Sequence, residues 1–420
     1  MNEINLQDEV LEHKSELIDL VRKLVSYPTT APNGRNTKKL QQWIADYLEK
    51  IDFTTNTWEL YPGDNELVGV HEGDSAYQSL ILNGHIDVAQ INEGEAWLQD
   101  PFQVLVKDGK LIGRGVADMK GAMAAFMLAL KILHESKVKL PGKIIFESVT
   151  GEEVGETGTL STLEKGYTAD FALNGDGNNL ELQGQGGVIT GWITIKSPQS
   201  FHDGMRRKLI HAGGQTKGAS AIEKMAKIIT ALGELERDWA VEKVYPGFPL
   251  GTSTINPAVI EGGRNPAFIA DECRLWITIH FYPNESYASV TREVEDYITR
   301  VADADVWMRD HHPTFEWGGK SMIEDQGEVF PSLEIDVKSQ PMILLKDVVE
   351  NVTKNPAVLS YNPSVTDGGW FSEYQIPAVI YGPGNLNSAH SVNESIKIDD
   401  LVKYTQTIIE FIVKWSNTRK

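Results

Sequence analysis

The stretch Leu80-Ile81-Leu82-Asn83-Gly84-His85-Ile86-Asp87-Val88 joins an apolar strand to an imidazole and a carboxylate. Residues i and i+2 of an extended strand point to the same face, so Asp87 can accept a hydrogen bond from one nitrogen of His85 and leave the other free. This arrangement prepares a histidine to hold a metal ion. A histidine beside an aspartate on a strand is more often a structural pair, so the interpretation depends on the rest of the chain.

The composition limits the kinds of site that this chain can build. Its 420 residues can bury a large core and suffice for two domains. The formal net charge of −20 argues against nucleic acid or an anionic membrane as a partner. The single cysteine, Cys273, excludes an internal disulfide and a cysteine-built zinc site. The amino terminus has no leader pattern and no run approaches about 18 apolar residues, so we expect a cytoplasmic protein.

Acidic residues follow predicted elements at three further points along the chain. Asp118 precedes a helix that is predicted to begin near Gly121, where the alternative interpretation is a helix N-cap. The buried strand predicted at 142–149 leads into Glu152-Glu153, and the strand at 170–173 leads into Asp176. Open α/β sheets place their sites at the carboxyl ends of the strands, so these acids are expected near His85.

The pattern of predicted elements changes in the middle of the chain. Between Gly187 and Gly318 the order is β-α-β-β-α-β, which is typical of a small ferredoxin-like domain. On either side, strands alternate with crossover helices. We therefore expect an α/β domain built from 1–188 and 319–420, with a mixed sheet flanked by helices. The insert would comprise 189–318.

The polar residues at these predicted strand ends form a set with a clear chemical meaning. Two zinc ions about 3.5 to 4 Å apart need one bridging carboxylate, plus one histidine and one further carboxylate for each ion. Glu152 is left over as a general base that takes a proton from the activated water. The chemistry implied is hydrolysis of an amide or related acyl bond. The five candidate ligands are His85, Asp118, Glu153, Asp176 and His390.

The motifs NGHIDV, GRGVADMKG, TGEEVGETG, NGDG and GPGNLNSAHSVNE resemble those of a known family. This is the family of co-catalytic zinc hydrolases, peptidase family M20, with acetylornithine deacetylase, succinyl-diaminopimelate desuccinylase and related carboxypeptidases and aminoacylases. The resemblance covers nearly the whole chain. It implies a zinc-hydrolase (phosphorylase/hydrolase-like) fold, a small N-acyl substrate, and two Zn²⁺ ions, which Co²⁺ or Mn²⁺ could replace.

The resemblance also implies a role for each site residue and a cis peptide bond after Asp118. The family often has a glutamate at the position of Asp176, which makes this the ligand that departs from the pattern. The implied roles are Asp118 as the bridging ligand, His85 and Asp176 on one ion, Glu153 and His390 on the other, Asp87 as the residue that orients His85, and Glu152 as the base.

The insert carries a segment that resembles the family's lid motif, Leu209-Ile210-His211-Ala212-Gly213 followed by 218–222. In the family, a histidine of the partner subunit reaches the site from this motif. The resemblance therefore implies that His211 stabilises the oxyanion, and that the insert is a lid and dimerisation domain of a homodimer. Without the family, His211 would be an ordinary loop histidine. We expect three other histidines to lie at the surface: His202, His311 and His312.

Two positions depart from the pattern of family members that act on amino acids. An asparagine and an arginine help to bind the substrate's carboxylate there, and this chain has Ala267 and His280. A neutral histidine cannot form the two parallel hydrogen bonds of an arginine. Arg264 or Asn265 could compensate only if the loop is rearranged.

Two substrates therefore stay open. The first is an acylated amino acid, as for acetylornithine deacetylase. The second is the N-formyl aminomethylpyrimidine that a branch of the family deformylates in thiamine salvage, on whose ring aromatic side chains could stack. A peptide substrate is also possible, and so is a non-catalytic binding relative, although no ligand or base is missing. The candidate aromatic residues are Trp276, Trp317, Trp370 and Phe371.

Overall fold

The computed structural model describes residues 5–31, 36–155, 157–177, 179–209, 216–324, 326–385 and 387–420. The chain divides into two compact units. Unit 1 comprises Met1–Gln185 and Leu333–Lys420, and unit 2 comprises Gly186–Ser332. Unit 2 extends beyond the 189–318 expected from the sequence, because the chain after Gly318 returns to pair a further strand with the sheet of this unit. No helix in these described ranges is long and apolar enough to cross a membrane.

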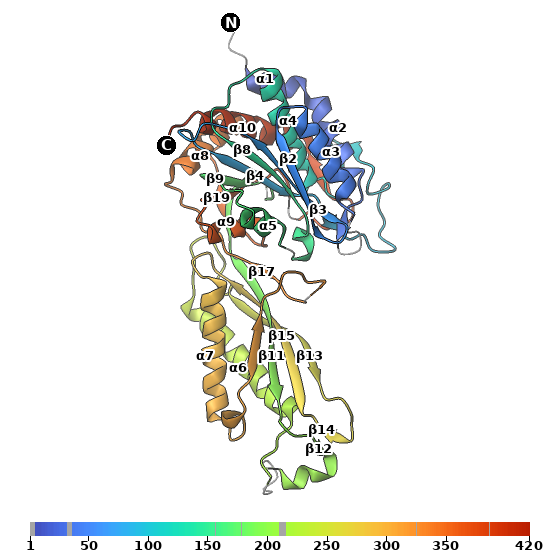
Figure 1. Cartoon of the computed structure of the whole chain (residues 1–420), viewed down its shortest axis with the longest axis vertical. Coiled ribbons are helices and arrows are strands. Elements are labelled where there is room, and N and C mark those ends of the chain that lie inside the picture. Colours follow the sequence, from blue (N-terminus) through green and yellow to red (C-terminus); the bar gives the residue numbers. More distant parts are fainter. Residues whose placement is uncertain are drawn as a thin grey trace. The chain divides into compact units, whose positions relative to one another are not determined.

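Unit 1 is built around an eight-stranded mixed sheet (Figure 1). The central strand β4 is parallel to both of its neighbours, β8 and β9, whereas β3 and β2 continue the sheet in antiparallel pairing. In sheet order the strands are β18 (Leu359–Asn362), β10 (Leu182–Gln185), β19 (Ala378–Ile380), β9 (Phe171–Asn174), β4 (Leu80–His85), β8 (Ile144–Val149), β3 (Asp64–His71) and β2 (Thr54–Tyr61).

Helices flank this sheet. Figure 1 shows α4 and α10 on one side of the central strands and α5 and α9 on the other. α4 is buried along nearly its whole length because its sequence between Gly121 and Leu130 is apolar, whereas α10 buries one face. The helices of unit 1 are α1 (Leu6–Glu12), α2 (Lys14–Val25), α3 (Lys38–Glu49), α4 (Lys120–Glu135), α5 (Gly158–Glu164), α8 (Gln340–Thr353), α9 (Trp370–Glu373) and α10 (Ile398–Ser416).

Two small sheets complete unit 1 and correct one expectation. β1 (Thr30–Ala31) pairs with β5 (Val88–Ala89). The strands β6 (Leu105–Lys107), β7 (Lys110–Ile112) and β20 (Ser395–Lys397) form a separate antiparallel sheet. Asp118 was expected at the end of a strand of the main sheet, but it follows β7 through a run of turns. The glycines Gly113 and Gly115 interrupt the strand pattern there, and Gly115 has a φ of 87°.

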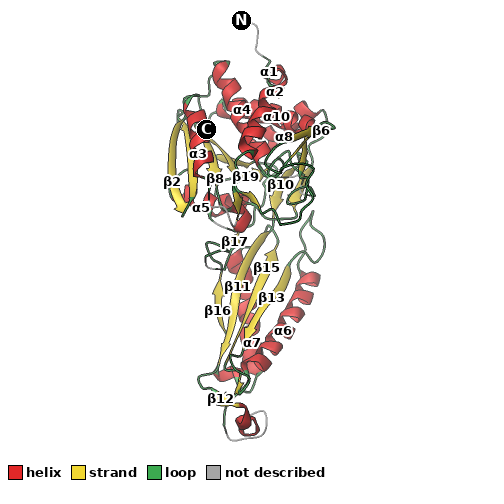
Figure 2. Ribbon diagram, turned by 90° about the vertical axis from the view of Figure 1, so that its right-hand side faces the viewer, coloured by secondary structure: helices red, strands yellow, loops and turns green. Residues whose placement is uncertain are grey.

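Unit 2 has the β-α-β-β-α-β order expected from the sequence. Figure 2 shows its two long helices, α6 (Ala221–Glu242) and α7 (Tyr287–Ala304), packed on one face of an antiparallel sheet. β15 alternates as predicted, with Leu275, Ile277 and Ile279 in the core between sheet and helices. The sheet strands are β13 (Thr254–Gly262), β15 (Glu272–Phe281), β11 (Gly187–Lys196) and β16 (Thr314–Trp317), and β17 (Val329–Phe330) also pairs with β11; β12 (Phe201–His202) pairs with β14 (Phe268–Ile269).

Candidate metal centre

All five candidate ligands belong to unit 1 and come from five separate segments. His85 is the last residue of β4, and Asp176 follows β9 by two residues. Glu153 lies in a short 3₁₀ helix, η1 (Glu152–Val154), directly beyond β8. Asp118 precedes α4, and His390 lies in the loop between β19 and β20. The parallel arrangement of β8, β4 and β9 brings three of these segments to one edge of the sheet.

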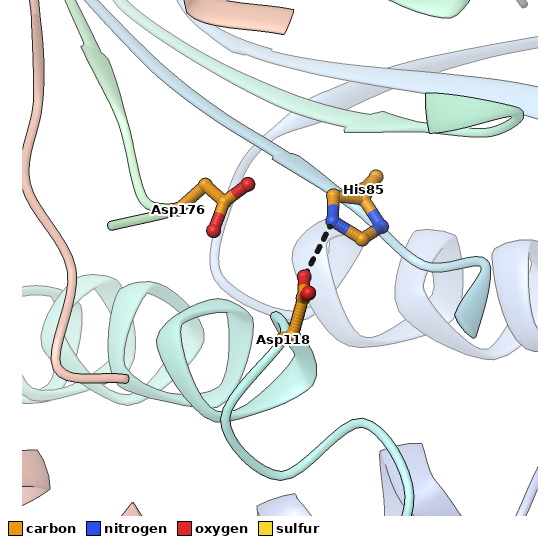
Figure 3. Close-up of side chains that lie close together, drawn as sticks. All are labelled: His85, Asp118 and Asp176. Atoms are coloured by element: carbon orange, nitrogen blue, oxygen red, sulfur yellow. Dashed lines mark hydrogen bonds and ion pairs between the residues drawn. The ribbon is translucent and has the colours of Figure 1, made fainter. Parts of the chain in front are cut away.

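His85, Asp118 and Asp176 form the first group of side chains that could hold a metal ion. One ligand atom from each lies within 4.8 Å of the other two. Nε2 of His85 is 3.1 Å from Oδ1 of Asp118, and Figure 3 shows the carboxylate of Asp176 pointing toward the same space. One nitrogen and two oxygens around a common point suit zinc, whose usual ligands in such sites are histidine and carboxylate.

Asp118, Glu153 and His390 form the second group, again with ligand atoms within 4.8 Å of one another. Nε2 of His390 lies 2.7 Å from Oε2 of Glu153 and 3.1 Å from Oδ2 of Asp118. Asp118 thus belongs to both groups, with one oxygen toward each histidine. This is the geometry that a bridging carboxylate needs.

Glu152 lies beside the first group without belonging to it. Its Oε2 is 3.8 Å from Nε2 of His85, and its side chain is 11% exposed. Burial raises the pKa of Glu152 well above its usual range; the nearby His85 lowers it, and the neighbouring carboxylates Asp176 and Glu153 raise it. A buried carboxyl with a raised pKa, close to the candidate ligands, is suited to exchanging a proton.

Asp87 organises the site in a slightly different way from the one expected. Nδ1 of His85 lies 3.0 Å from the backbone oxygen of Asp87 and 3.5 Å from its carboxylate Oδ1. The other carboxylate oxygen of Asp87 accepts a hydrogen bond from the backbone N–H of Glu153, at 3.0 Å. Asp87 therefore contacts one residue of each ligand group.

The electrostatics of the site fit two divalent cations. Burial and the charge of Asp118 raise the pKa of Glu153 and of Asp176 to about 7 in each case. Among the described residues, Oε1 of Glu153 and Oδ1 of Asp87 are buried without a hydrogen-bond partner. Crowded carboxylates with unpaired buried oxygens need positive charge nearby. The same carboxylates favour the charged form of His390, because hydrogen bonds with Asp118 and Glu153 raise the pKa of this histidine to about 11. Metal cations would supply this charge directly.

The backbone around the ligands adopts conformations that are rare elsewhere. The peptide bond between Asp118 and Met119 is cis, as the resemblance implied. Gly151 and Gly155, which flank η1, have φ values of 85° and 63°. His390 has a φ of 57°, in the left-handed region that side chains other than glycine seldom occupy. Left-handed backbone at a residue other than glycine, as at His390, is concentrated at functional sites.

The remaining candidates have varied positions. His211 lies outside the described residues. Arg264 forms an ion pair with Asp271 and donates to Oγ of Ser200 at 2.7 Å. His280 and Ala267 are both exposed. Of the other histidines, His202 and His312 are exposed as expected, and His311 is half-buried and stacks on a tryptophan ring.

The aromatic candidates are less suited to stacking than the sequence suggested. Phe371 is completely buried and Trp370 is 7% exposed, so neither presents an open ring face. Trp317 stacks on Phe315, and Trp276 donates its indole N–H to a backbone oxygen 3.0 Å away. These tryptophans are half-buried in the sheet of unit 2.

A buried polar network beneath the ligands was not anticipated. Asn83, two residues before His85, donates to Glu147 at 2.9 Å and to Thr159 at 3.0 Å. Thr159 in turn donates to Asp367 at 2.8 Å. Burial raises the pKa of Glu147 and of Asp367 to about 7. The signal in the sequence was the placement of Asn83 and Glu147 within strands that are otherwise mainly apolar.

A family comparison matches residues 81–414 of the chain to "Peptidase family M20/M25/M40". The chain belongs to this family. It is therefore an enzyme that hydrolyses an amide bond. A structure of a dinuclear metal binding peptidase from the M20 family of Bacillus subtilis has the same fold, with a TM-score of 0.67 and 15% identity over 96% of this chain and 98% of that one.

Within the M20 family, two relatives that resemble this chain over its full length share one name. A protein of Bacillus subtilis (strain 168), named N-formyl-4-amino-5-aminomethyl-2-methylpyrimidine deformylase, is 56% identical over 99% of this chain and 98% of its own length. The deformylase of the same name from Halalkalibacterium halodurans is 55% identical, with both chains covered completely. An acetylornithine deacetylase from Proteus mirabilis is 25% identical over 90% of this chain and 91% of its own. Of the substrates left open by the sequence, the formylated pyrimidine is better supported than the acetylated amino acid, which was the first expectation.

Proposed function

We propose that this chain deformylates N-formyl-4-amino-5-aminomethyl-2-methylpyrimidine, releasing formate and the free aminomethylpyrimidine. The observation that carries the proposal is the 56% identity to a deformylase of that name over 99% of the chain. The candidate centre supplies what hydrolysis of an amide requires, which is a set of metal ligands with a separate carboxyl beside them.

The proposed ligands divide between two zinc ions as the two groups do. His85 and Asp176 would hold one ion, and Glu153 and His390 would hold the other. Asp118 would contribute a ligand to both ions. Bound there, the ions would polarise the formyl oxygen and lower the pKa of a water molecule. Zinc is proposed because histidine nitrogens and carboxylate oxygens are its usual ligands where cysteine is absent.

Glu152 is proposed as the general base. Its carboxylate would accept a proton from the attacking water and then donate that proton to the nitrogen of the leaving amine. Glu153, its neighbour, is held in a different direction because its backbone N–H is bound by Asp87 and its side chain contacts His390. The two adjacent glutamates can therefore have different roles.

The absence of a carboxylate from the pyrimidine agrees with the environment of Arg264. This guanidinium is engaged by Asp271 and Ser200 and would have to leave both to bind an amino-acid carboxylate. His280 cannot replace it, since a neutral imidazole has a single N–H donor and cannot form the two parallel hydrogen bonds of a guanidinium. A neutral heterocyclic substrate requires no such clamp.

We also propose a homodimer, on the basis of the lid-like segment 209–222, and a cytoplasmic location. Light scattering on the purified protein tests the first of these proposals. A dimer mass supports it, and a monomer mass at working concentrations contradicts it.

The test of the proposed activity is formate release from the formylated pyrimidine by protein loaded with two equivalents of zinc. We expect turnover that a chelator abolishes and that added zinc restores. Formate release that is unaffected by the chelator, or no release at all, would contradict the proposal.

A further inference from the structure

A buried ion pair joins the segment that carries Asp118 to the segment that carries His390. Arg114 and Glu394 have side chains that are each 1% exposed, and Nη1 of Arg114 lies 2.9 Å from Oε2 of Glu394. The two residues are 280 positions apart in the chain. A fully buried arginine and glutamate are costly unless each finds several partners, so their other contacts are informative.

Glu394 receives hydrogen bonds on both oxygens from the backbone just before Asp118. Oε2 also accepts from the N–H of Gly115 at 3.0 Å. Oε1 accepts from the N–H of Ala117 at 2.8 Å and from that of Asp118 itself at 3.1 Å. With Arg114, four donors therefore converge on one carboxylate. This contact fixes the turn that presents Asp118 to both ligand groups.

Arg114 and the backbone extend the contact to His390. Nη2 of Arg114 is 3.4 Å from the backbone oxygen of His390. The N–H of Gly113 donates to the backbone oxygen of Glu394 at 2.9 Å. The left-handed backbone of His390 is unfavourable for a side-chain residue, so its loop needs outside support. Arg114 and Glu394 provide that support.

We propose that Glu394 is a positioning residue that fixes the bridging carboxylate of Asp118 relative to the imidazole of His390. The inference rests on the proposed two-metal centre. It predicts that a substitution of Glu394 lowers the affinity for one metal ion more than the affinity for the other. The ion held by Asp118, Glu153 and His390 has two ligands on segments that Glu394 joins. The other ion shares Asp118, but its remaining ligands are His85, which Asp87 contacts, and Asp176, and neither lies on a segment that Glu394 joins.

The chain contains a matched control for a merely structural ion pair. In unit 2, the side chains of Asp305 and Lys224 are 2% and 1% exposed, and Nζ of Lys224 lies 2.7 Å from Oδ1 of Asp305. The same oxygen accepts backbone hydrogen bonds from Trp307 and Met308, each at 2.9 Å. Asp305 thus has partners of the same kinds as Glu394, a buried cation and backbone N–H groups, and none of these partners is a candidate ligand.

The experiment compares Glu394→Gln with Asp305→Asn in the full-length protein. Protein stripped of metal is titrated with Zn²⁺ in a calorimeter, and the absorption spectrum of the Co²⁺-loaded protein is recorded. We expect two bound ions in the wild type and in Asp305→Asn, with unchanged affinities. In Glu394→Gln, the affinity for one ion should fall on the order of 10- to 100-fold, as when an outer partner of a ligand is lost, with a changed Co²⁺ spectrum.

The outcomes separate this inference from the proposed function. Two ions bound by Glu394→Gln with wild-type affinities and spectrum would overturn the positioning role and leave the proposed function standing. Fewer than two ions in the wild type would overturn both. If Glu394→Gln does not fold, Arg114→Met decides. This variant keeps the three backbone hydrogen bonds of Glu394 but removes the contact to His390. In Arg114→Met, a lower affinity for the ion assigned to Asp118, Glu153 and His390 supports the proposal, and unchanged affinities for both ions contradict it.

Discussion

At the scale of the residue, Asp118 and Glu152 are two buried carboxyl groups whose surroundings shift their pKa values in opposite directions. Hydrogen bonds with His390 and His85 outweigh burial and hold the pKa of Asp118 well below its usual range, so it stays ionised between the histidines. Burial instead raises the pKa of Glu152, and this residue lies outside both ligand groups. A bridging carboxylate must be ionised to bind two cations, whereas a proton carrier must be able to change its protonation state.

The first prediction concerns Glu152→Gln. An amide cannot accept the proton of the attacking water, so kcat should fall by roughly 10²- to 10⁴-fold. Because Glu152 belongs to neither ligand group, the variant should still bind two zinc ions. Steady-state formate release and metal analysis of the same sample measure both quantities. Glu164→Gln, at an exposed position, is the control and should behave as the wild type.

The second prediction concerns the pH dependence of stability through Asp305. Burial opposes its ionisation, but hydrogen bonds from Lys224, Lys227 and the backbone outweigh burial and hold its pKa well below the usual range. A depressed pKa in the folded state contributes stability above the unfolded value of about 3.9, and this contribution is lost as the pH falls through the folded-state value. Asp305→Asn should destabilise unit 2 by about 3 to 5 kcal/mol at pH 7, since Lys224 stays buried without its partner.

Urea unfolding at a series of pH values measures this effect. The difference in free energy of unfolding between the wild type and Asp305→Asn should shrink as the pH falls below about 4. If the difference in free energy of unfolding stays constant at all acidic pH values, the folded state does not favour the ionised form of Asp305.

The strands of this fold were predictable where the sequence is mainly apolar. The strands β4, β8 and β9 are fully buried, and their apolar runs placed His85, Glu153 and Asp176 at the correct strand ends. The short strands β10 and β18 were not predicted, because LQGQ and LSYN carry no such pattern. Local sequence also could not show that Asp118 follows β7 of a separate small sheet.

The same reasoning explains which site residues sequence analysis could not find. Ligands are recognisable because their residue types and strand-end positions have a chemical meaning. The partnership of Arg114 with Glu394 depends on the pairing of β7 with β20, which only the tertiary structure supplies. The link from Asn83 through Thr159 to Asp367 likewise joins three segments that are far apart in sequence.

The third prediction tests the close packing of the element that carries Asp176. A Cβ on Gly382 would overlap the backbone oxygen of Gly175 and lie 2.9 Å from the backbone of Asp176. Gly382→Ala should therefore displace this segment, destabilise the protein by about 1 to 3 kcal/mol and weaken zinc binding. Chemical unfolding and zinc titration measure the two effects.

Gly233→Ala is the matched control for Gly382→Ala. Gly233 lies inside α6, and a Cβ there has no neighbour within 4 Å. Alanine favours a helix interior over glycine, so this variant should be more stable by about 0.5 to 1 kcal/mol. Equal effects of the two substitutions would contradict the packing argument.

At the scale of the whole molecule, the acidic composition makes the centre dependent on cations. The chain has a net charge of −20, and its candidate centre concentrates buried carboxylates whose pKa values burial raises. Ions that bind only the folded protein stabilise it by mass action, by about 2.7 kcal/mol for one site at a hundredfold excess over Kd.

The fourth prediction follows from this linkage. Removal of divalent metal with a chelator should lower the melting temperature, and zinc should restore it in a concentration-dependent way. Asp118→Asn, which alters the ligand shared by both groups, should melt at nearly the same temperature with and without zinc. A wild-type melting temperature that does not respond to metal would contradict a structural contribution of the centre.

The measurement that tests the central claim most directly is the ratio of kcat/KM for two substrates on the same zinc-loaded preparation. The substrates are N-formyl-4-amino-5-aminomethyl-2-methylpyrimidine and N-acetylornithine. Because Arg264 is engaged by Asp271, we predict a preference for the pyrimidine on the order of 100-fold or more. Equal or greater kcat/KM for N-acetylornithine would contradict the proposed function.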